Sequence, residues 1–187
     1  MATGTQTRAT LDDLYGVEGK AELIGGRIVQ FMASGDWPGE VALNIAVGVR
    51  GHAKKIGKGV GHGDGVGYAV AELPSGRESF SPDASYFAGP RTAKRMRFIA
   101  GPPTFAAEVR SENDYGAAAE ADMAEKRDDY FAAGTLVVWD VDPLAECIHV
   151  YRANDPGQPA TYRRGQVAEA EPAVPGWRMA VDDVFAQ

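Results

Sequence analysis

Short runs of apolar and alternating residues recur along the chain and predict β-strands. The stretch Glu22–Phe31 contains two such runs around Gly25-Gly26, a dipeptide typical of a hairpin turn. Residues 136–141 form a dense apolar run, as expected for a strand covered on both faces. Further strands are predicted at residues 83–87, 104–110 and 147–152, and near Thr161 and Trp177.

Two longer segments have features of helices. The first is predicted from Pro38 to about Lys55, because its apolar residues recur at helical spacing. These residues are Val41, Ile45 and Val49. The second is predicted over about 117–132, with Gly134 as its C-cap. Single helical turns are expected at 11–15 and 181–185.

The order of these elements predicts the fold class. The helix between the strands at 104–110 and 136–141 is a long crossover, and such a crossover can make two strands parallel. We therefore expect an α/β (mixed α+β) fold with a mixed central sheet flanked by helices. Residues 1–10 are predicted to be a disordered tail, and 11–187 a single domain.

Composition narrows the class of protein. The chain has 187 residues, 44% hydrophobic and 24% charged, as in ordinary globular domains. No apolar run is long enough to span a bilayer, and the N-terminus has no apolar stretch of the signal-peptide type. The only cysteine, Cys147, can form no internal disulfide. A cytoplasmic protein without membrane contact is expected.

The formal net charge of −7 argues against a protein that coats nucleic acid by bulk charge. It is compatible with an enzyme whose carboxylates hold a cation. Two local basic clusters lie at 54–58 and 91–97. Their members are Lys54, Lys55 and Lys58, then Arg91, Lys94, Arg95 and Arg97. Each cluster fits either a phosphate contact or a solvated surface.

Candidate chemistry converges on Asp83, Glu108 and Lys126. If their strands are neighbours, Asp83 and Glu108 would present carboxylate oxygens suited to Mg²⁺ or Mn²⁺, and the Val109 carbonyl could add a ligand. Such a metal would activate a water and neutralise charge on a scissile phosphate. Lys126 could orient that water or neutralise the phosphate. The alternative interpretation is a surface pair of Lys126 with Asp122, with Glu108 on a solvent face and Asp83 capping a turn.

Other candidate sites are weaker. His52, His62 and His149 show no metal-ligand spacing, which disfavours a zinc site. Cys147 falls in a predicted strand and is interpreted as a core residue. The glycines of the stretch at 57–73 are expected to punctuate strands rather than build a helix, and the stretch lacks the patterns of nucleotide-binding loops.

Around these residues the chain resembles the putative restriction endonuclease (Uma-two) family of the PD-(D/E)XK nuclease superfamily. Residues 21–29 resemble the family's hairpin motif YELIDGxIV, and 81–83 resemble its SPD motif. Residues 102–111 resemble PPDLVVEVLS, and 126–134 resemble KxxxYxxAG. Residues 137–143 resemble xEYWxVDP, and 174–177 with 184–185 resemble LPGF…LF. The resemblance runs in order over nearly the whole chain from about residue 11.

The resemblance implies a restriction-endonuclease-like core and metal-dependent cleavage of DNA. It implies that Asp83 and Glu108 are metal ligands, and that Lys126 takes the role of the motif's lysine from the following helix. It also places Glu22 where the family keeps an acidic residue near the site.

Three departures from the family pattern stand out. Arg110 occupies the position of the lysine in the short form of the motif. Because arginine stays protonated it cannot be a general base, although its fork could hold a phosphate. The insert at 112–116 lengthens the stretch before Lys126, and Glu40 stands where relatives often have histidine.

Three functions are therefore open. The first is a Mg²⁺-dependent endonuclease acting on DNA, with a homodimer as a plausible assembly. The second is a catalytically weak nucleic-acid-binding or interaction module on the same fold. The third is a hydrolase of another phosphate ester.

Overall fold

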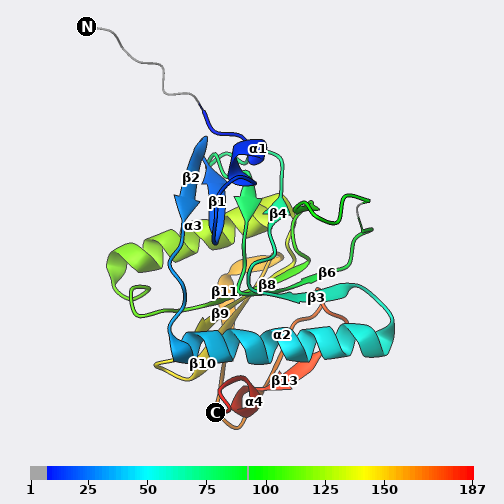
Figure 1. Ribbon diagram of the computed structural model, residues 1–187. Coiled ribbons are helices and arrows are strands. Elements are labelled where there is room, and N and C mark those ends of the chain that lie inside the picture. Colours follow the sequence, from blue (N-terminus) through cyan, green and yellow to red (C-terminus); the bar gives the residue numbers. More distant parts are fainter. Residues whose placement is uncertain (1–7, 92) are drawn as a thin grey trace, which may run out of the picture.

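The computed structural model describes residues 8–91 and 93–187. Within these residues the centre of the molecule is a six-stranded sheet in the order β11-β10-β9-β8-β6-β3 (Figure 1). Its strands are β3 (Val60–Gly63), β6 (Ala84–Phe87), β8 (Phe105–Val109), β9 (Val137–Asp142), β10 (Cys147–Arg152) and β11 (Asp155–Arg163). β8 and β9 are parallel and the other neighbouring pairs are antiparallel. The predicted mixed sheet and its parallel crossover pair are confirmed.

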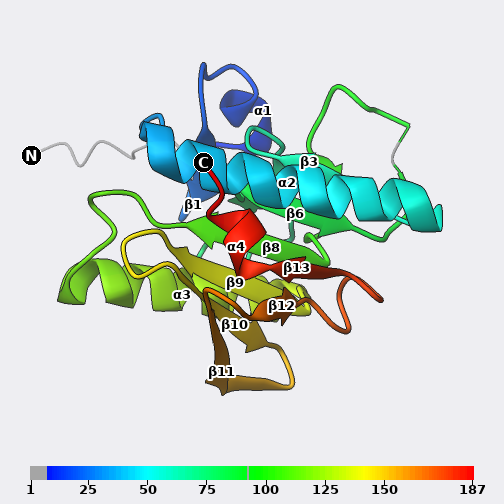
Figure 2. The ribbon, with the colours of Figure 1, turned by 90° about the horizontal axis from the view of Figure 1, so that it is seen from below.

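One helix covers each face of this sheet. α2 (Asp36–Ile56) lies on one side and α3 (Ala117–Ala133) on the other (Figures 1 and 2). Alternation along β8 divides its side chains between them. Phe105, Ala107 and Val109 pack in the core under α2, whereas Ala106 packs with Tyr130 of α3. Glu108 shares the parity of Ala106 and therefore faces the α3 side.

The helix boundaries follow from local chemistry. α2 begins two residues before the predicted Pro38, because a proline is tolerated in the first turn, where the N–H has no helical partner. α3 ends as predicted, with Gly134 in the left-handed region at φ 109°.

Smaller elements surround the central sheet. The predicted hairpin is confirmed as β1 (Ala21–Ile24) and β2 (Arg27–Gln30). Its turn residues Gly25 and Gly26 both have positive φ, as a two-residue type I′ turn requires. The remaining elements are β4 (Tyr68–Ala69), β5 (Ser79–Phe80), β7 (Ile99–Ala100), β12 (Val167–Glu169), β13 (Arg178–Ala180), α1 (Leu11–Leu14) and α4 (Val181–Val184). The two expected helical turns are α1 and α4, and β4 lies in the glycine-rich stretch predicted to form short strands, whereas β5, β7 and β12 were not predicted.

The predicted tail needs a correction at its C-terminal end. Residues 1–7 lie outside the described residues. Residues 8–10 contact the domain: the Ala9 N–H donates to the Gly26 carbonyl at 2.9 Å, and the Thr10 side chain caps α1. In the described part of the chain, no helix is long and apolar enough to cross a membrane. The single cysteine, Cys147, is buried in β10.

Gly61 permits the close packing of β3 on α2. A Cβ at this position would lie 2.6 Å from the Arg50 backbone. We therefore expect Gly61→Ala to lower the free energy of unfolding by about 1–3 kcal/mol, because the strand or the helix must shift. Gly51→Ala, in α2 with nothing within 4 Å of its added Cβ, is the matched control. It should raise stability by about 0.5–1 kcal/mol. Equal effects of the two substitutions in urea titrations would contradict this packing.

Candidate active site

Asp83 and Glu108 lie next to each other at one end of the inner strands β6 and β8, on the sheet face that carries α3. Asp83 directly precedes β6, which pairs antiparallel with β8. Its N–H donates to the Ala107 carbonyl at 3.1 Å, and its Oδ2 accepts from the Val109 N–H at 2.8 Å. Because strand residues alternate between faces, Asp83 and Glu108 point to the same side. The structure thus brings the two predicted carboxylates together.

α3 supplies a lysine and a tyrosine to Glu108. Lys126 Nζ lies 2.9 Å from Glu108 Oε2 and 3.3 Å from Glu22 Oε1. The Tyr130 hydroxyl donates to Glu108 Oε1 at 2.6 Å. Lys126 and Tyr130 are four residues apart, so they project from one face of the helix. The predicted position of Lys126 next to the carboxylates is therefore found, although the insert at 112–116 precedes it.

Glu22 is a fully buried carboxylate that joins the hairpin to this cluster. It comes from β1 and has no exposed surface. Its Oε1 accepts from the Ser81 N–H at 2.8 Å, and its Oε2 pairs with Arg77. Arg77 also donates to Asp129 Oδ2 at 2.8 Å. A buried charge needs such partners, since desolvation costs several kcal/mol per ion.

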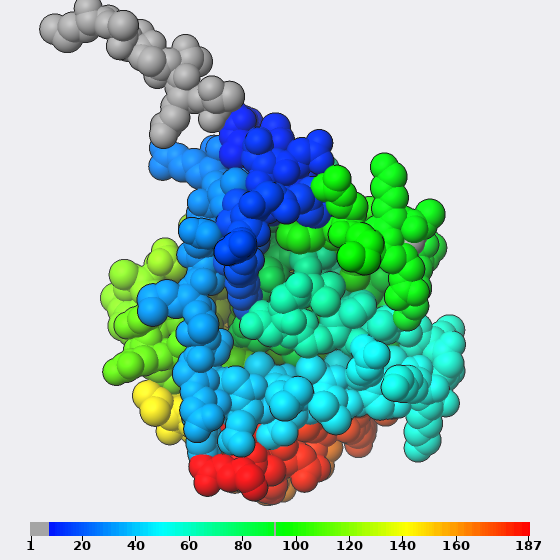
Figure 3. Space-filling view, viewed as in Figure 1, coloured from blue at the N-terminus to red at the C-terminus, as the bar shows by residue number. Residues whose placement is uncertain are grey.

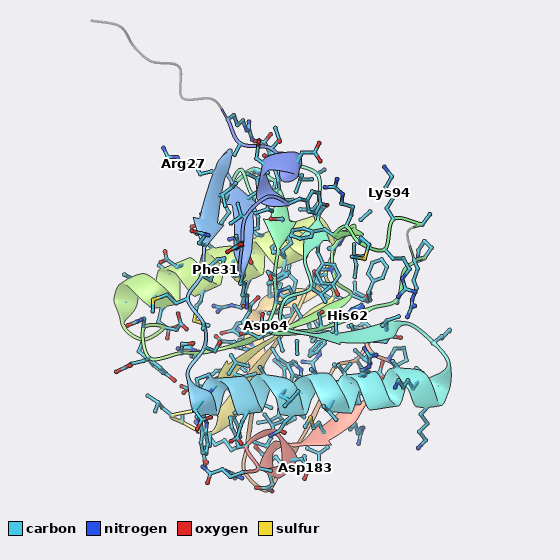
Figure 4. The ribbon with its side chains drawn as sticks, viewed as in Figure 1. Arg27, Phe31, His62, Asp64, Lys94 and Asp183 are labelled. Carbon is cyan, nitrogen blue, oxygen red and sulfur yellow. The ribbon has the colours of Figure 1, made fainter. Side chains whose placement is uncertain are left out.

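A second lysine pairs with Asp83. Lys20 Nζ lies 2.5 Å from Asp83 Oδ1 and 2.9 Å from Asp64 Oδ1. Asp64, labelled in Figure 4, is an exposed residue of the turn after β3. Each of the two candidate ligands, Asp83 and Glu108, therefore carries its own ammonium partner.

The charges in the cluster shift one another's pKa values. Burial raises the pKa of Glu108, and Asp83 and Glu22 add to that rise against the opposing effect of Lys126. Burial also acts to raise the pKa of Glu22, but Lys126, Arg77 and the Ser81 N–H together lower it below its ordinary value. Burial acts to lower the pKa of Lys126, but Glu108 and Glu22 outweigh it, so the pKa is raised. Lys126 is consequently a cation at neutral pH.

Arg110 does not join this cluster. Its guanidinium binds Asp140 in a fork, with Nε–Oδ1 at 2.8 Å and Nη2–Oδ2 at 2.9 Å, and also pairs with Glu120. Hydrogen bonds to Asp140 are the main reason that the pKa of Arg110 is raised. The fork considered above for a phosphate is therefore held by protein carboxylates.

The chemistry of the oxygen donors can be compared with what a metal needs. In 8–91 and 93–187 there is no group of three or more His, Cys, Asp and Glu side chains arranged to hold a metal ion. Mg²⁺, however, is usually bound through one or two carboxylates and keeps several waters. The pair Asp83 and Glu108 meets that requirement. Val109, next in sequence to Glu108, offers a backbone carbonyl on the same strand.

Comparison with known proteins places the chain in a family. The family model described as "Uma2: Putative restriction endonuclease" matches residues 9–182. The chain belongs to the Uma2 family. The crystal structure of a putative nuclease of the DUF820 group from Anabaena variabilis is similar, with a TM-score of 0.71 and 19% sequence identity. The alignment covers 94% of the Uma2 chain and 97% of the other. At that identity the likeness shows a shared fold. A comparison with curated protein sequences gives no match.

Sequence reasoning missed several residues of this Uma2 site. Lys20 was missed, although it lies two residues before the predicted Glu22 at the start of a strand, so a shared face was a usable signal. Asp129 and Tyr130 follow Lys126 by three and four residues, the spacing of one helix face. Arg77 lies outside any periodic segment and gives no comparable signal.

We expect Glu22→Gln to lower the free energy of unfolding by about 3 kcal/mol at neutral pH, because it leaves buried cations without a full counter-charge. The folded-state pKa of Glu22 lies below its ordinary value of 4.5. Its contribution is therefore present above pH 4.5 and is lost as the pH falls through the folded-state pKa. Urea titrations at several pH values should show the difference between variant and wild type shrinking in acid.

The matched control for that titration is Glu40→Gln, an exposed glutamate in α2. It should change stability by less than about 0.5 kcal/mol. A pH-independent or negligible effect of Glu22→Gln would contradict the buried ion network.

Proposed function

We propose that this Uma2 protein is a metal-dependent endonuclease that hydrolyses phosphodiester bonds in DNA. The observation that carries the proposal is the convergence of Asp83, Glu108 and Lys126 from two adjacent strands and one helix. Family membership supports the same reaction class. Two carboxylates beside a partly buried, protonated lysine suit a reaction in which negative charge grows on a phosphate.

Asp83 and Glu108 are the proposed ligands of Mg²⁺ or Mn²⁺, with the Val109 carbonyl as a third. Such an ion, when bound, lowers the pKa of a coordinated water and neutralises charge on the scissile phosphate. Glu108 must be ionised to bind the metal. Because its pKa is raised, the lowest pH at which the metal binds is also raised. The Val109 N–H orients Asp83, and the Tyr130 hydroxyl orients Glu108.

Lys126 acts as a cation in this proposal. Its raised pKa keeps the ammonium protonated, so it donates hydrogen bonds to a phosphate oxygen or to the attacking water and does not accept the water's proton. Glu22, linked to Lys126 and Arg77, fixes the lysine's position. Glu22 is therefore a positioning residue, since its carboxylate is fully buried.

One observation favours a second function, a nucleic-acid-binding or interaction module with weak catalysis. Lys20 pairs with Asp83 and Lys126 with Glu108, so both carboxylates are neutralised by protein cations. A metal must displace or share at least one of these partners. A hydrolase of small phosphate esters is the third possibility, and substrate range separates it from the first.

Purified protein should nick supercoiled plasmid in Mg²⁺ or Mn²⁺ and be inactive in EDTA. Asp83→Asn, Glu108→Gln and Lys126→Met should each lower the rate at least about a hundredfold, the typical loss when a group that stabilises the transition state is removed. Asp122→Asn is the matched control, because Asp122 is exposed on the same helix as Lys126. Its rate should equal that of wild type.

Two results would contradict the catalytic proposal. One is cleavage that persists in EDTA or in the Asp83→Asn protein, since a contaminating nuclease would then account for it. The other is the absence of both cleavage and metal binding by calorimetry, which would favour the binding module. Cleavage of small phosphodiesters but of no DNA would favour the third function.

Lys20 offers a test of metal binding that does not depend on activity. Lys20→Met removes the ammonium that competes for Asp83. We expect about tenfold tighter Mg²⁺ or Mn²⁺ binding, because the metal ion no longer has to displace the positively charged ammonium of Lys20 from Asp83. We also expect lower thermal stability without metal and a larger metal-induced rise in Tm than in wild type.

The control for this comparison is Lys55→Met, at an exposed lysine of α2. Calorimetry should give it the wild-type metal affinity. If Lys20→Met binds the metal no more tightly than wild type, then Lys20 and the metal ion do not compete for Asp83.

A further inference from the structure

Positive charge is concentrated in two exposed segments, 50–58 and 91–97. They contain no Asp or Glu, whereas the rest of the chain holds all 26 acidic residues and 11 of the 19 Lys and Arg residues. The basic residues are Arg50, Lys54, Lys55 and Lys58, and then Arg91, Lys94, Arg95 and Arg97. All of them are exposed. The net charge of −7 therefore conceals a strong asymmetry.

The fold places the two segments at the same end of the molecule, with β3 and β6 between them (Figure 1). The first is the C-terminal part of α2, which leads into β3. The second follows β6, and the pairing of Val60 with Phe87 brings the start of β3 to the end of β6. Both segments lie on the right in Figures 1 and 2, and Lys94 is labelled there in Figure 4. In the space-filling view the 91–97 segment projects above the end of α2 (Figure 3). We call this combined surface the basic face.

Positive charges from both segments affect the pKa of His62 in β3. Burial is the main cause that lowers its pKa, and the positive charges of Arg50, Arg91 and Arg95 lower it further. Arg50 belongs to the first segment and the other two to the second. The arginines therefore act on one residue of the sheet edge, which agrees with the strand pairing.

The basic face connects to the candidate active site along β6. Asp83 directly precedes this strand, and the 91–97 segment follows it after the three further residues Ala88–Pro90. The four residues of β6 span about 13 Å at ~3.3 Å per residue, or about four nucleotide steps of ~3.4 Å. Residues of one surface pocket contact both regions. The pocket is lined by Lys20, which pairs with Asp83, and by Tyr15 and Phe98. The Arg97 guanidinium stacks 4.2 Å from the centre of the Tyr15 ring.

We propose that the basic face binds the phosphate backbone of DNA and directs one strand past the edge strand β3 towards Asp83 and Glu108. This inference rests on the proposed function and adds the surface that holds the substrate. The spacing of about four nucleotides means that the contacted phosphates are neighbours of the scissile one, not the scissile phosphate itself. Binding through this face is independent of base sequence, since backbone contacts carry no base information.

The test is fluorescence anisotropy of a labelled DNA duplex and of its single strand, in EDTA so that no cleavage occurs. The loop variant Arg91→Gln/Lys94→Gln/Arg95→Gln and the helix variant Lys54→Gln/Lys55→Gln/Lys58→Gln each remove three cations. The slope of log affinity against log salt should become shallower by about 3 in each, at ~0.9 per phosphate contact. Affinity at about 100 mM salt should fall roughly tenfold or more. Arg97 is kept because it packs on Tyr15.

The matched control is Arg27→Gln/Arg163→Gln/Arg178→Gln, which removes three exposed arginines outside the basic face. Arg27 lies at the opposite side from Lys94 in Figure 4. The control should bind DNA with the wild-type slope. Circular dichroism should show every variant folded, because all the substitutions are at exposed positions.

A second readout separates this inference from the proposed function. Hydrolysis of bis(4-nitrophenyl) phosphate, a diester too small to reach the basic face from the carboxylates, should be unchanged in both triple variants. If wild type hydrolyses nothing while DNA binding still depends on the face, the inference stands and the catalytic proposal fails. Wild-type DNA affinity in the triple variants, or binding of anionic vesicles with no binding of DNA, would overturn the inference.

Discussion

The pairing of the buried carboxylate of Glu22 and the partly buried carboxylate of Glu108 with protein cations is the constraint on which the rest of the structure depends. Glu22 comes from the N-terminal hairpin, Glu108 from the central sheet and Lys126 from α3. Lys126 lies within 3.3 Å of both carboxylates, so one ammonium joins three parts of the chain that are distant in sequence. Removal of any member leaves an uncompensated charge, which costs far more than a lost surface pair. The network therefore fixes the β1–β2 hairpin and α3 over one end of the inner strands β6 and β8.

The same constraint explains how the site departs from the short form of the nuclease motif. The residue two positions after Glu108 is Arg110, and its guanidinium is held by Asp140 of the neighbouring strand. The lysine that faces Glu108 comes instead from the helix above the sheet. Two carboxylates from the sheet and a lysine from α3 together supply charges of the kind that phosphoryl transfer requires. In the short form of the motif the lysine would instead follow Glu108 at position 110. The surface proposed to hold DNA, the basic face, lies elsewhere, so the proposal is compatible with an acidic site and an acidic chain.

Much of this arrangement could be predicted from sequence, and the failures have physical reasons. Period-two alternation identified β8 and the face of Glu108, and the family resemblance selected Asp83 and Lys126 from many possible acids and lysines. β5 and β7, which were not predicted, have two residues each, too few for any periodicity to appear. Arg77 pairs with a partner 55 positions away, and only the tertiary fold creates that contact. The contact between Arg110 and Asp140 was easier to predict than that of Arg77, because Asp140 lies opposite Glu108 in the predicted parallel strand pair.

The most direct measurement of the central claim is a crystal structure of the protein soaked in Mn²⁺, with anomalous diffraction data. The account predicts an anomalous peak bonded to the carboxylates of Asp83 and Glu108, at about 2.1 Å for Mg²⁺-like coordination. It also predicts that the Lys20 ammonium has moved away from Asp83. An anomalous map without a peak at these carboxylates, with Lys20 still bound to Asp83 at saturating Mn²⁺, would contradict the metal-dependent mechanism.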